Sequence, residues 1–148
     1  LAKEYGATDI ISYKDGDLVQ QILEKEGGKV DCAIIAGGSA ESMNQALMLV
    51  KNNGTIANVN FYDVTDTFNI PTYLWGLGMS DITIRGGFCP GGAYRIKKML
   101  NLIQAGRIAP EKLLNYQYEG FDKIQDAFTV MDEKPRDLIK PVVHIKWD

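Results

Sequence analysis

The chain has 148 residues, 45% hydrophobic and 24% charged, which is enough apolar material for a folded core of ordinary size. Its formal net charge of -3 gives no electrostatic reason to expect nucleic acid or an anionic membrane as a partner. No apolar run approaches the length of a membrane-spanning helix, and the two isolated cysteines, Cys32 and Cys89, do not suggest a disulfide framework. We therefore expect a globular protein of the reducing cytoplasm.

The first five residues have the pattern of a helix that is already in progress, and Gly6 is its expected stop. We therefore expect the sequence to be part of a longer protein. A short strand is predicted over residues 7–13, followed by turn residues. A helix is predicted over residues 18–26, because Asp17 can cap its first turn and its apolar residues share one side.

A strand–helix–strand unit is predicted over residues 30–60. Residues 30–36 form an apolar run that is typical of a strand buried on both faces of a parallel sheet. Gly37 and Gly38 then allow a sharp turn, after which Ser39 is a candidate helix cap. Because ligands bind outside the carboxyl ends of the strands in open α/β sheets, this glycine turn is the best candidate for a binding site.

Apolar spacing predicts which side of each helix is buried. In the helix after the glycine turn the apolar positions are Met43, Ala46, Leu47 and Val50. The Asn-Asn-Gly sequence at 52–54 is expected to stop that helix, before a strand over residues 55–61. A later helix is predicted to end at residue 105, and its apolar positions are Ile96, Met99, Leu100 and Ile103.

The elements after residue 61 are predicted from turn residues and apolar runs. In chain order they are a surface loop over 62–71, an apolar stretch broken by glycines over 74–79, a strand over 83–85, a break over 88–92, the helix to residue 105, a helical turn over 111–114, a strand over 116–118, a helix over 121–133 and a strand over 138–147. The apolar stretch fits either a helical turn on the sheet or a surface that contacts a partner. The break is the candidate domain boundary, and Pro141 favours an edge or bulge position for the last strand.

Few residues have the spacing that catalytic or metal sites require. His144 is the single histidine, and no cysteine or histidine spacing resembles a zinc site. Ser39 lacks the G-x-S-x-G pattern of a nucleophile, so capping is its expected role. The dinucleotide fingerprint G-x-G-x-x-G is absent, and Gly37-Gly38 fits a tight turn without a ligand as well as a binding turn.

Two further places leave alternatives open. Cys89 lies among glycines and either lines a cavity or is buried as a small apolar residue. Lys134, Arg136 and Lys140 follow the predicted helix over 121–133, where they either offset the helix dipole or contact a phosphate.

Six segments in a fixed order carry a resemblance to a known family. They are GATDIISY (6–13), VDCAIIAGGS (30–39), NNGTIANVNF (52–61), LWGLGM (74–79), IRGGFCPGG (84–92) and EKPRDLIKPVV (133–143). The series closely resembles the C-terminal part of zinc-containing, NADP-dependent secondary alcohol dehydrogenases, the tetrameric type of the medium-chain family. The resemblance covers the whole chain. It implies an α/β fold, with residues 1–88 as the later half of a Rossmann-type parallel sheet in the NADP-binding domain and residues 89–148 as an α+β return segment of the catalytic domain.

The resemblance implies an oxidoreductase that transfers a hydride between NADP(H) and a small secondary alcohol or ketone, with a bound zinc polarising the alcohol oxygen. It also implies roles within this sequence: the 2′-phosphate near Tyr13 and Lys134, the nicotinamide-side ribose near Ala36, Gly37 and Gly38, the nicotinamide near Asn60 and Phe61, the substrate pocket near Cys89, and a neighbouring subunit's pocket near Met79. Phe61 stands where the family would have tyrosine, which removes a hydroxyl and puts a polar role there in doubt.

The resemblance also implies which parts of the enzyme lie outside this sequence. The family's zinc ligands, glycine fingerprint and main 2′-phosphate arginine belong before Leu1. We therefore expect no catalytic residue and no metal ligand here, only part of an NADP site, and no activity of the isolated chain. The strand over 30–36 would then be an exposed sheet edge. The full-length enzyme is expected to be a homotetramer, and a dimer or higher oligomer is considered for the isolated chain.

Two other functions stay open on the residues alone. One is a non-catalytic oligomerisation or folding module, held together by residues 75–79 and the strand edge over 83–85. The other is a different α/β enzyme with a nucleotide cofactor, such as a methyltransferase.

Overall fold

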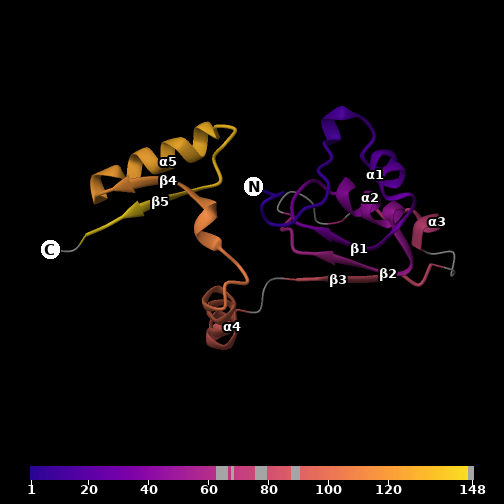
Figure 1. Cartoon of the computed structure of the whole chain (residues 1–148). Helices are drawn as coiled ribbons and strands as arrows, with labels where there is room; N and C mark the ends of the chain where they lie inside the picture. The colour runs from indigo at the N-terminus through magenta and orange to yellow at the C-terminus, as the bar shows by residue number, and fades with distance from the viewer. Residues whose placement is uncertain (63–66, 68, 76–79, 88–90, 147–148) are drawn as a thin grey trace. The chain divides into compact units, whose positions relative to one another are not determined.

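The computed structural model describes residues 1–62, 67, 69–75, 80–87 and 91–146 (Figure 1). By their contacts the residues form two compact units, Leu1–Cys89 and Pro90–Asp148. Among the described residues, no helix has both the length and the apolar character needed to cross a membrane.

The first unit contains a parallel sheet of three strands in the order β1-β2-β3. Its elements are η1 (Tyr13–Asp15), α1 (Leu18–Glu26), β1 (Val30–Ile35), α2 (Glu41–Leu49), β2 (Val50–Asn58), α3 (Thr72–Trp75) and β3 (Thr83–Gly86). Alternation of strands and helices with parallel pairing confirms the predicted α/β class. The helix predicted over residues 18–26 is also confirmed, with the Asp17 carboxylate accepting a hydrogen bond from the Gln20 N–H at 2.8 Å.

The core of the first unit lies between the sheet and α2. Figure 1 shows α1 and α2 on the same side of the three strands. The buried cluster consists of Ile35, Met43, Ala46, Leu47, Val50 and Ile56. The apolar face predicted from the spacing of Met43, Ala46 and Leu47 is therefore confirmed, because all three side chains are buried.

The start of the chain differs from the prediction. Residues 1–6 form a turn, in which the Tyr5 N–H donates to the Leu1 carbonyl at 3.1 Å, and not a helix end. The strand predicted over residues 7–13 is wrong, since none of these residues pairs with β1, β2 or β3. A strand needs a neighbouring backbone to satisfy its hydrogen bonds, and the described sheet offers none to this segment. The Ser12 side chain instead caps η1.

The end of α2 also differs from the prediction. The helix ends at Leu49, and Val50 already begins β2 in register with Val30. The Asn-Asn-Gly sequence at 52–54 lies inside β2, at an irregularity where Asn53 has φ 64°. Val50 is fully buried, so burial in the sheet and not the turn residues decides where the helix gives way to a strand.

Two expectations about β1 have different outcomes. The prediction of a strand buried on both faces is wrong: Ile35 is 5% exposed, but Ile34 is 72% exposed and Cys32 is exposed. Alternate side chains of a strand point to opposite faces, and α2 covers only one of them. The expectation that β1 forms a sheet edge is confirmed for the described residues, since β1 pairs with β2 alone.

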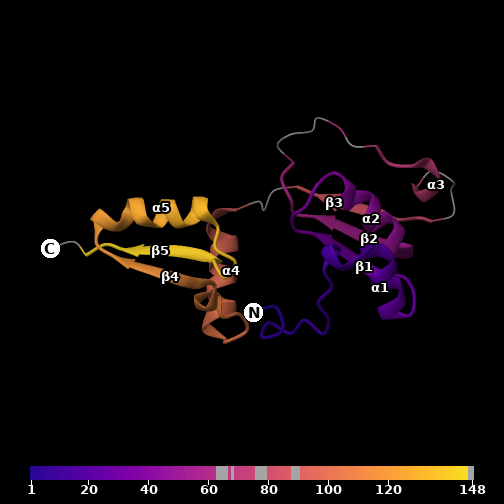
Figure 2. The ribbon, with the colours of Figure 1, turned by 90° about the horizontal axis from the view of Figure 1, so that it is seen from above.

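The second unit consists of helices and one pair of strands. Its elements are α4 (Gly92–Gln104), η2 (Pro110–Leu113), β4 (Leu114–Glu119), η3 (Phe121–Lys123), α5 (Ile124–Glu133) and β5 (Lys140–His144). β4 and β5 pair in parallel, and α5 runs along them (Figure 2). Leu114 lies opposite Lys140 while Tyr116 lies opposite Pro141, so the ladder is irregular beside the proline. The predicted edge or bulge position of Pro141 is confirmed.

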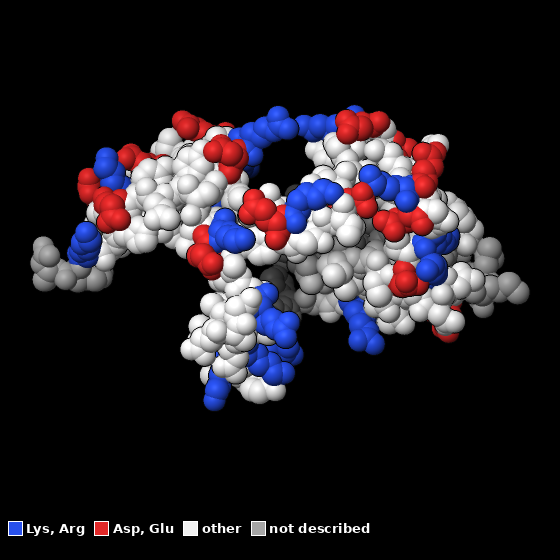
Figure 3. All heavy atoms as spheres, viewed as in Figure 1, with Lys and Arg blue, Asp and Glu red and all other residues white. Residues whose placement is uncertain are grey.

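Helix α4 keeps its apolar face in the solvent. Ile96, Met99, Leu100 and Ile103 share one side, as the spacing predicts, but all four are exposed. The same helix carries Arg95, Lys97 and Lys98 and no acidic residue. In Figure 3 the face of α4 that is in view shows basic and no acidic side chains. The apolar face of α4 is therefore not buried within its own unit among the described residues.

Candidate functional site

The carboxyl ends of the three parallel strands define one candidate site in the first unit. Residues 36–38 follow β1, residues 59–61 follow β2, and Gly87 follows β3. Ligands of open α/β sheets bind at this edge. A small pocket of about 100 Å³ lies there, lined by Asn58, Val59, Asn60, Phe61 and Gly87.

Two hydrogen bonds join the segment that follows β2 to the end of β1 and to the glycine turn after it. The Val59 N–H donates to the Ile35 carbonyl at 2.9 Å. The Asn60 side-chain amide donates to the Gly38 carbonyl at 3.4 Å. Gly38 and Asn60, which the resemblance places around one ligand, are thus in direct contact.

The glycine turn leaves room for a ligand beside its backbone. Gly38 has φ 96°, a conformation that residues with a side chain rarely adopt, and a Cβ atom there would meet the Ser42 hydroxyl. Around a Cβ built at Gly37 the space is open. Ala36 and Gly37 are exposed. A planar ring or a sugar can therefore approach this backbone closely.

Asn58 lines the same small pocket, and it was not singled out from the sequence. It is the last residue of β2, and its side-chain amide forms hydrogen bonds with the backbone of Asn60. The signal that could have revealed it is the Asn-x-Asn spacing at the end of a predicted strand. Phe61 is 66% exposed at the rim of the same pocket.

Tyr13 lies away from the glycine turn in sequence, in the short helix η1. Its ring is 74% exposed. The neighbouring residues Ser12 and Asp15 line a polar pocket of about 410 Å³ together with residues of α1. Close by in the chain, the Lys25 ammonium donates to Asp9 at 2.9 Å, and this hydrogen bond lowers the pKa of the Asp9 carboxyl.

Lys134 belongs to the second unit, where it ends α5. Its backbone has φ 47° and ψ 57°, and its N–H donates to the Val130 carbonyl at 3.1 Å. The side chain is exposed. The structure therefore describes Lys134 within the second unit only. In the first unit it brings Gly38 and Asn60 into contact.

The turn after Lys134 is tied to the start of β4. The Asn115 side-chain oxygen accepts hydrogen bonds from the Ile139 N–H at 3.0 Å and the Lys140 N–H at 3.3 Å. The Tyr116 hydroxyl donates to the Asp137 carboxylate at 3.0 Å, and this bond raises the pKa of the hydroxyl. The position of Lys134 at the helix end is therefore supported from the following strand pair.

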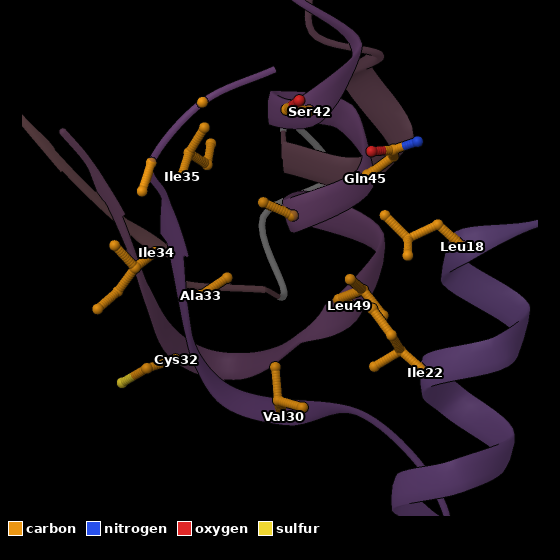
Figure 4. A pocket seen from close by; sticks show the side chains of 13 residues that line it. Leu18, Ile22, Val30, Cys32, Ala33, Ile34, Ile35, Ser42, Gln45 and Leu49 are labelled. Atoms are coloured by element: carbon orange, nitrogen blue, oxygen red, sulfur yellow. The ribbon is translucent and has the colours of Figure 1, made fainter. Parts of the chain in front are cut away.

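A second, apolar space lies along the open edge of β1. It is a groove of about 380 Å³ between β1, α1 and α2. Figure 4 shows Leu18, Ile22 and Val30 pointing into this groove, while Cys32 and Ile34 point away on the other face of the strand. The groove carries no charged lining residue, so it has the character of an unfilled core and not of a reaction site.

A metal centre does not fit the described residues. Nowhere in them do three or more histidine, cysteine, aspartate or glutamate side chains come together as a metal site requires. His144 lies on β5 with its Nε2 atom 3.2 Å from the Gln117 side-chain oxygen. Met79 and Cys89, which the resemblance places at substrate pockets, lie outside the residues that the structure describes.

Comparisons of sequence place the chain among known proteins. The family model described as zinc-binding dehydrogenase matches residues 1–105. The chain is 50% identical over 143 residues to the NADP-dependent isopropanol dehydrogenase of Thermoanaerobacter brockii, with 96% of this chain and 41% of that protein covered. It is 46% identical over 149 residues to the protein of the same name from Entamoeba histolytica, with 100% and 41% covered. The chain thus spans about two fifths of the length of these relatives.

A comparison of structures gives the same grouping. The crystal structure of benzyl alcohol dehydrogenase from Acinetobacter calcoaceticus aligns with a TM-score of 0.80 and 28% sequence identity. The alignment covers 98% of this chain and 39% of that one.

Proposed function

We propose that this chain, which belongs to the zinc-binding dehydrogenase family, carries part of the NADP site of an oxidoreductase that interconverts secondary alcohols and ketones. The observation that carries the proposal is the identity of 50% and 46%, across almost the whole chain, with two NADP-dependent isopropanol dehydrogenases. The same observation favours a dehydrogenase over a methyltransferase or a non-catalytic module. The activity belongs to the longer protein.

The site at the carboxyl ends of the strands would hold the nicotinamide half of the cofactor. The proposal assigns Ala36, Gly37 and Gly38 to the ribose, and Asn60 and Phe61 to the nicotinamide. Open space beside Gly37 and the hydrogen bond from Asn60 to the Gly38 carbonyl support this assignment. When bound, the nicotinamide supplies or accepts the hydride. The residues of this chain bind the cofactor, orient it and shape the space around it.

Tyr13 and Lys134 are proposed to lie beside the adenosine 2′-phosphate. A lysine ammonium is a point charge that favours a dianionic phosphate over a hydroxyl, and so favours NADP over NAD. Both side chains are exposed, and Lys134 stands at a helix end that is held by the turn after it.

The chain is proposed to contribute to two domains. Residues 1–88 would be the later half of the cofactor domain, and residues 89–148 would return to the catalytic domain. The division of contacts between Cys89 and Pro90 supports this assignment. Cys89 and Met79 are proposed for the substrate pockets of one subunit and its neighbour in a homotetramer. We place the protein in the cytoplasm, where the free thiol of Cys32 stays reduced.

Zinc is proposed for the longer protein, with ligands that lie outside this chain. The described residues hold no cluster that could bind it, so no catalytic step is assigned to them. The isolated chain is expected to be inactive.

The test uses the full-length protein that carries this sequence. We expect oxidation of isopropanol with NADP+, and we expect Lys134→Gln to raise the KM for NADP+ by about 10- to 100-fold, the value of a lost charge-assisted hydrogen bond. The KM for NAD+ should change little. Lys97→Gln on α4 is the matched control. Equal effects on both cofactors would contradict the role of Lys134, and binding of S-adenosylmethionine in place of NADPH would overturn the proposed function.

A further inference from the structure

We propose that Asn58 is a positioning residue of the cofactor site, which fixes the backbone of Asn60 and, through Asn60, the glycine turn. This inference rests on the proposed function, because it assumes that the carboxyl ends of β1 and β2 receive NADP(H). The resemblance to the dehydrogenases assigns no role to Asn58.

Asn58 forms a two-way pair with one peptide segment. Its Nδ2 atom donates to the Asn60 carbonyl at 2.9 Å, and its Oδ1 atom accepts from the Asn60 N–H at 3.3 Å. A side-chain amide can do both at once because it carries a donor and an acceptor on one planar group. Aspartate keeps only the acceptor, and alanine keeps neither. Asn58 therefore sets the orientation of both backbone groups of Asn60.

Asn60 passes this constraint to the turn after β1. Its own side chain donates to the Gly38 carbonyl at 3.4 Å. The backbone between the two asparagines is held as well, since the Val59 N–H donates to the Ile35 carbonyl at 2.9 Å. Asn58 thus begins a chain of contacts that links the end of β2 to the glycine turn.

β3 closes the other side of Asn58. Gly86 pairs with Asn58 in the ladder, and a Cβ atom built on Gly86 would lie 3.6 Å from the Asn58 Cβ and 3.9 Å from its Nδ2. In the sheet, Asn58 is therefore flanked by Ile35 of β1 and Gly86 of β3. It lines the small pocket together with Val59, Asn60 and Gly87.

A charged side chain at position 58 would distinguish an effect at the nicotinamide from a general loss of structure, because the two change the affinities for NADP+ and NADPH differently. The oxidised nicotinamide ring is cationic and the reduced ring is neutral. A carboxylate at this position attracts only the oxidised form, and in a partly solvated site the expected effect is about threefold in affinity. A purely structural defect weakens both forms equally.

The experiment compares Asn58→Ala and Asn58→Asp with Asn52→Ala and Asn52→Asp, in the full-length protein. Asn52 lies in the same strand, exposed and distant in register from the site. We expect Asn58→Ala to raise the dissociation constant of NADPH by about tenfold, because about the free energy of one hydrogen bond that fixes Asn60 is lost. Amide hydrogen exchange over residues 59–61 in the ligand-free protein should accelerate in Asn58→Ala. Asn58→Asp should raise the ratio of the NADPH to the NADP+ dissociation constant by about threefold.

The outcomes are distinct. Unchanged hydrogen exchange over residues 59–61, or unchanged NADPH affinity in Asn58→Ala, would overturn the positioning role, as would a dissociation-constant ratio that Asn58→Asp leaves at the wild-type value. Effects of the same size in the Asn52 variants would overturn it too. A wild-type protein that binds neither NADP+ nor NADPH would instead overturn the proposed function, and this is measured before any variant is compared.

Discussion

Gly38 decides the path of the chain between β1 and α2. Its φ of 96° lies in the left-handed region, and a Cβ atom there would meet the Ser42 hydroxyl at the start of α2. A residue with a side chain costs about 1–2 kcal/mol in this region of backbone conformation. The carbonyl of the same residue accepts from Asn60. One glycine thus combines the turn with the contact between the two strand ends.

We expect Gly38→Ala to lower the free energy of unfolding by about 1–2 kcal/mol, because the backbone must leave its conformation or strain. The same movement should separate the turn from Asn60 and weaken NADPH binding by the full-length protein. Urea unfolding and an NADPH titration measure the two effects.

Gly106→Ala is the matched control for this substitution. Gly106 has φ 64°, its surroundings are open, and it follows α4 in the other unit. It should show a similar loss of stability with unchanged NADPH affinity. A fall in NADPH affinity of the same size in both variants would contradict the role of Gly38 in the site.

Gly54 has a different role from the one its sequence context indicates. After two asparagines it has the pattern of a helix stop, yet it is buried inside β2. A Cβ atom there would meet Val50 and would lie 2.8 Å from the Asp31 carbonyl oxygen. The glycine is therefore needed for the close approach of β1 and β2, which only the pairing of the two strands reveals.

At the scale of elements, β4 and β5 depend on side chains as much as on their ladder. The ladder is interrupted opposite Pro141, and Asn115 and Tyr116 bind the residues that lead into β5. The Asn115 side-chain oxygen accepts from the backbone N–H groups of Ile139 and Lys140, whereas the Tyr116 hydroxyl donates to the Asp137 side chain. The bond from Tyr116 to Asp137 forms only while the Tyr116 hydroxyl is protonated.

We expect the stability of the second unit to fall above the ordinary tyrosine pKa of 10.0, because the hydrogen bond to Asp137 raises the pKa of Tyr116 in the folded state. A raised pKa favours the protonated form in the folded state. Its contribution is therefore full below pH 10.0 and is lost as the pH rises through the higher value of the folded protein. Unfolding midpoints across this pH range, compared between wild type and Tyr116→Phe, measure the effect.

The phenylalanine variant cannot ionise at this position, so part of the alkaline loss should disappear from it. An alkaline loss of stability that is identical in wild type and Tyr116→Phe would show that the bond to Asp137 contributes nothing. Tyr94→Phe on the exposed face of α4 controls for the removal of a hydroxyl.

At the scale of the whole molecule, the described residues leave apolar surface and a sheet edge uncovered. β1 pairs on one side only, the apolar groove runs along its other side, and Ile34 projects from the uncovered face. Open edges with apolar neighbours promote pairing between chains. The small net charge of -3 opposes association only weakly.

We expect the 148-residue chain to associate as its concentration rises, and Ile34→Lys to weaken this association at least about tenfold. A lysine on β1 places a charge where a partner strand or surface would bury it. Sedimentation velocity over a concentration series gives the result.

Ile10→Lys is the control for this prediction, since Ile10 is also exposed but lies outside the sheet. Association that is unaffected by Ile34→Lys, or reduced equally by Ile10→Lys, would show that the β1 edge is not the contact. A strict monomer at every concentration would contradict the prediction outright.

The order of the elements from α1 to β2 and from β3 to β5, the apolar face of α2 and the cap of α1 at Asp17 followed from the sequence alone. These features depend on residues within one or two turns of each other, so local spacing and capping chemistry determine them. The family resemblance, carried by six segments along the chain, likewise needed no coordinates. It led to Gly37, Gly38 and Asn60, two of which the structure brings into contact.

Only the tertiary structure decided whether a segment pairs, which face it buries and which side chain supports the site. Residues 7–13 have strand character but find no partner in the described sheet, and β1 is apolar except for Asp31 but is covered on one face only. Asn58 differs from other exposed or half-buried asparagines only in what surrounds it. Strand pairing, burial and hydrogen bonds of this kind depend on segments that are distant in sequence, so no local pattern can determine them.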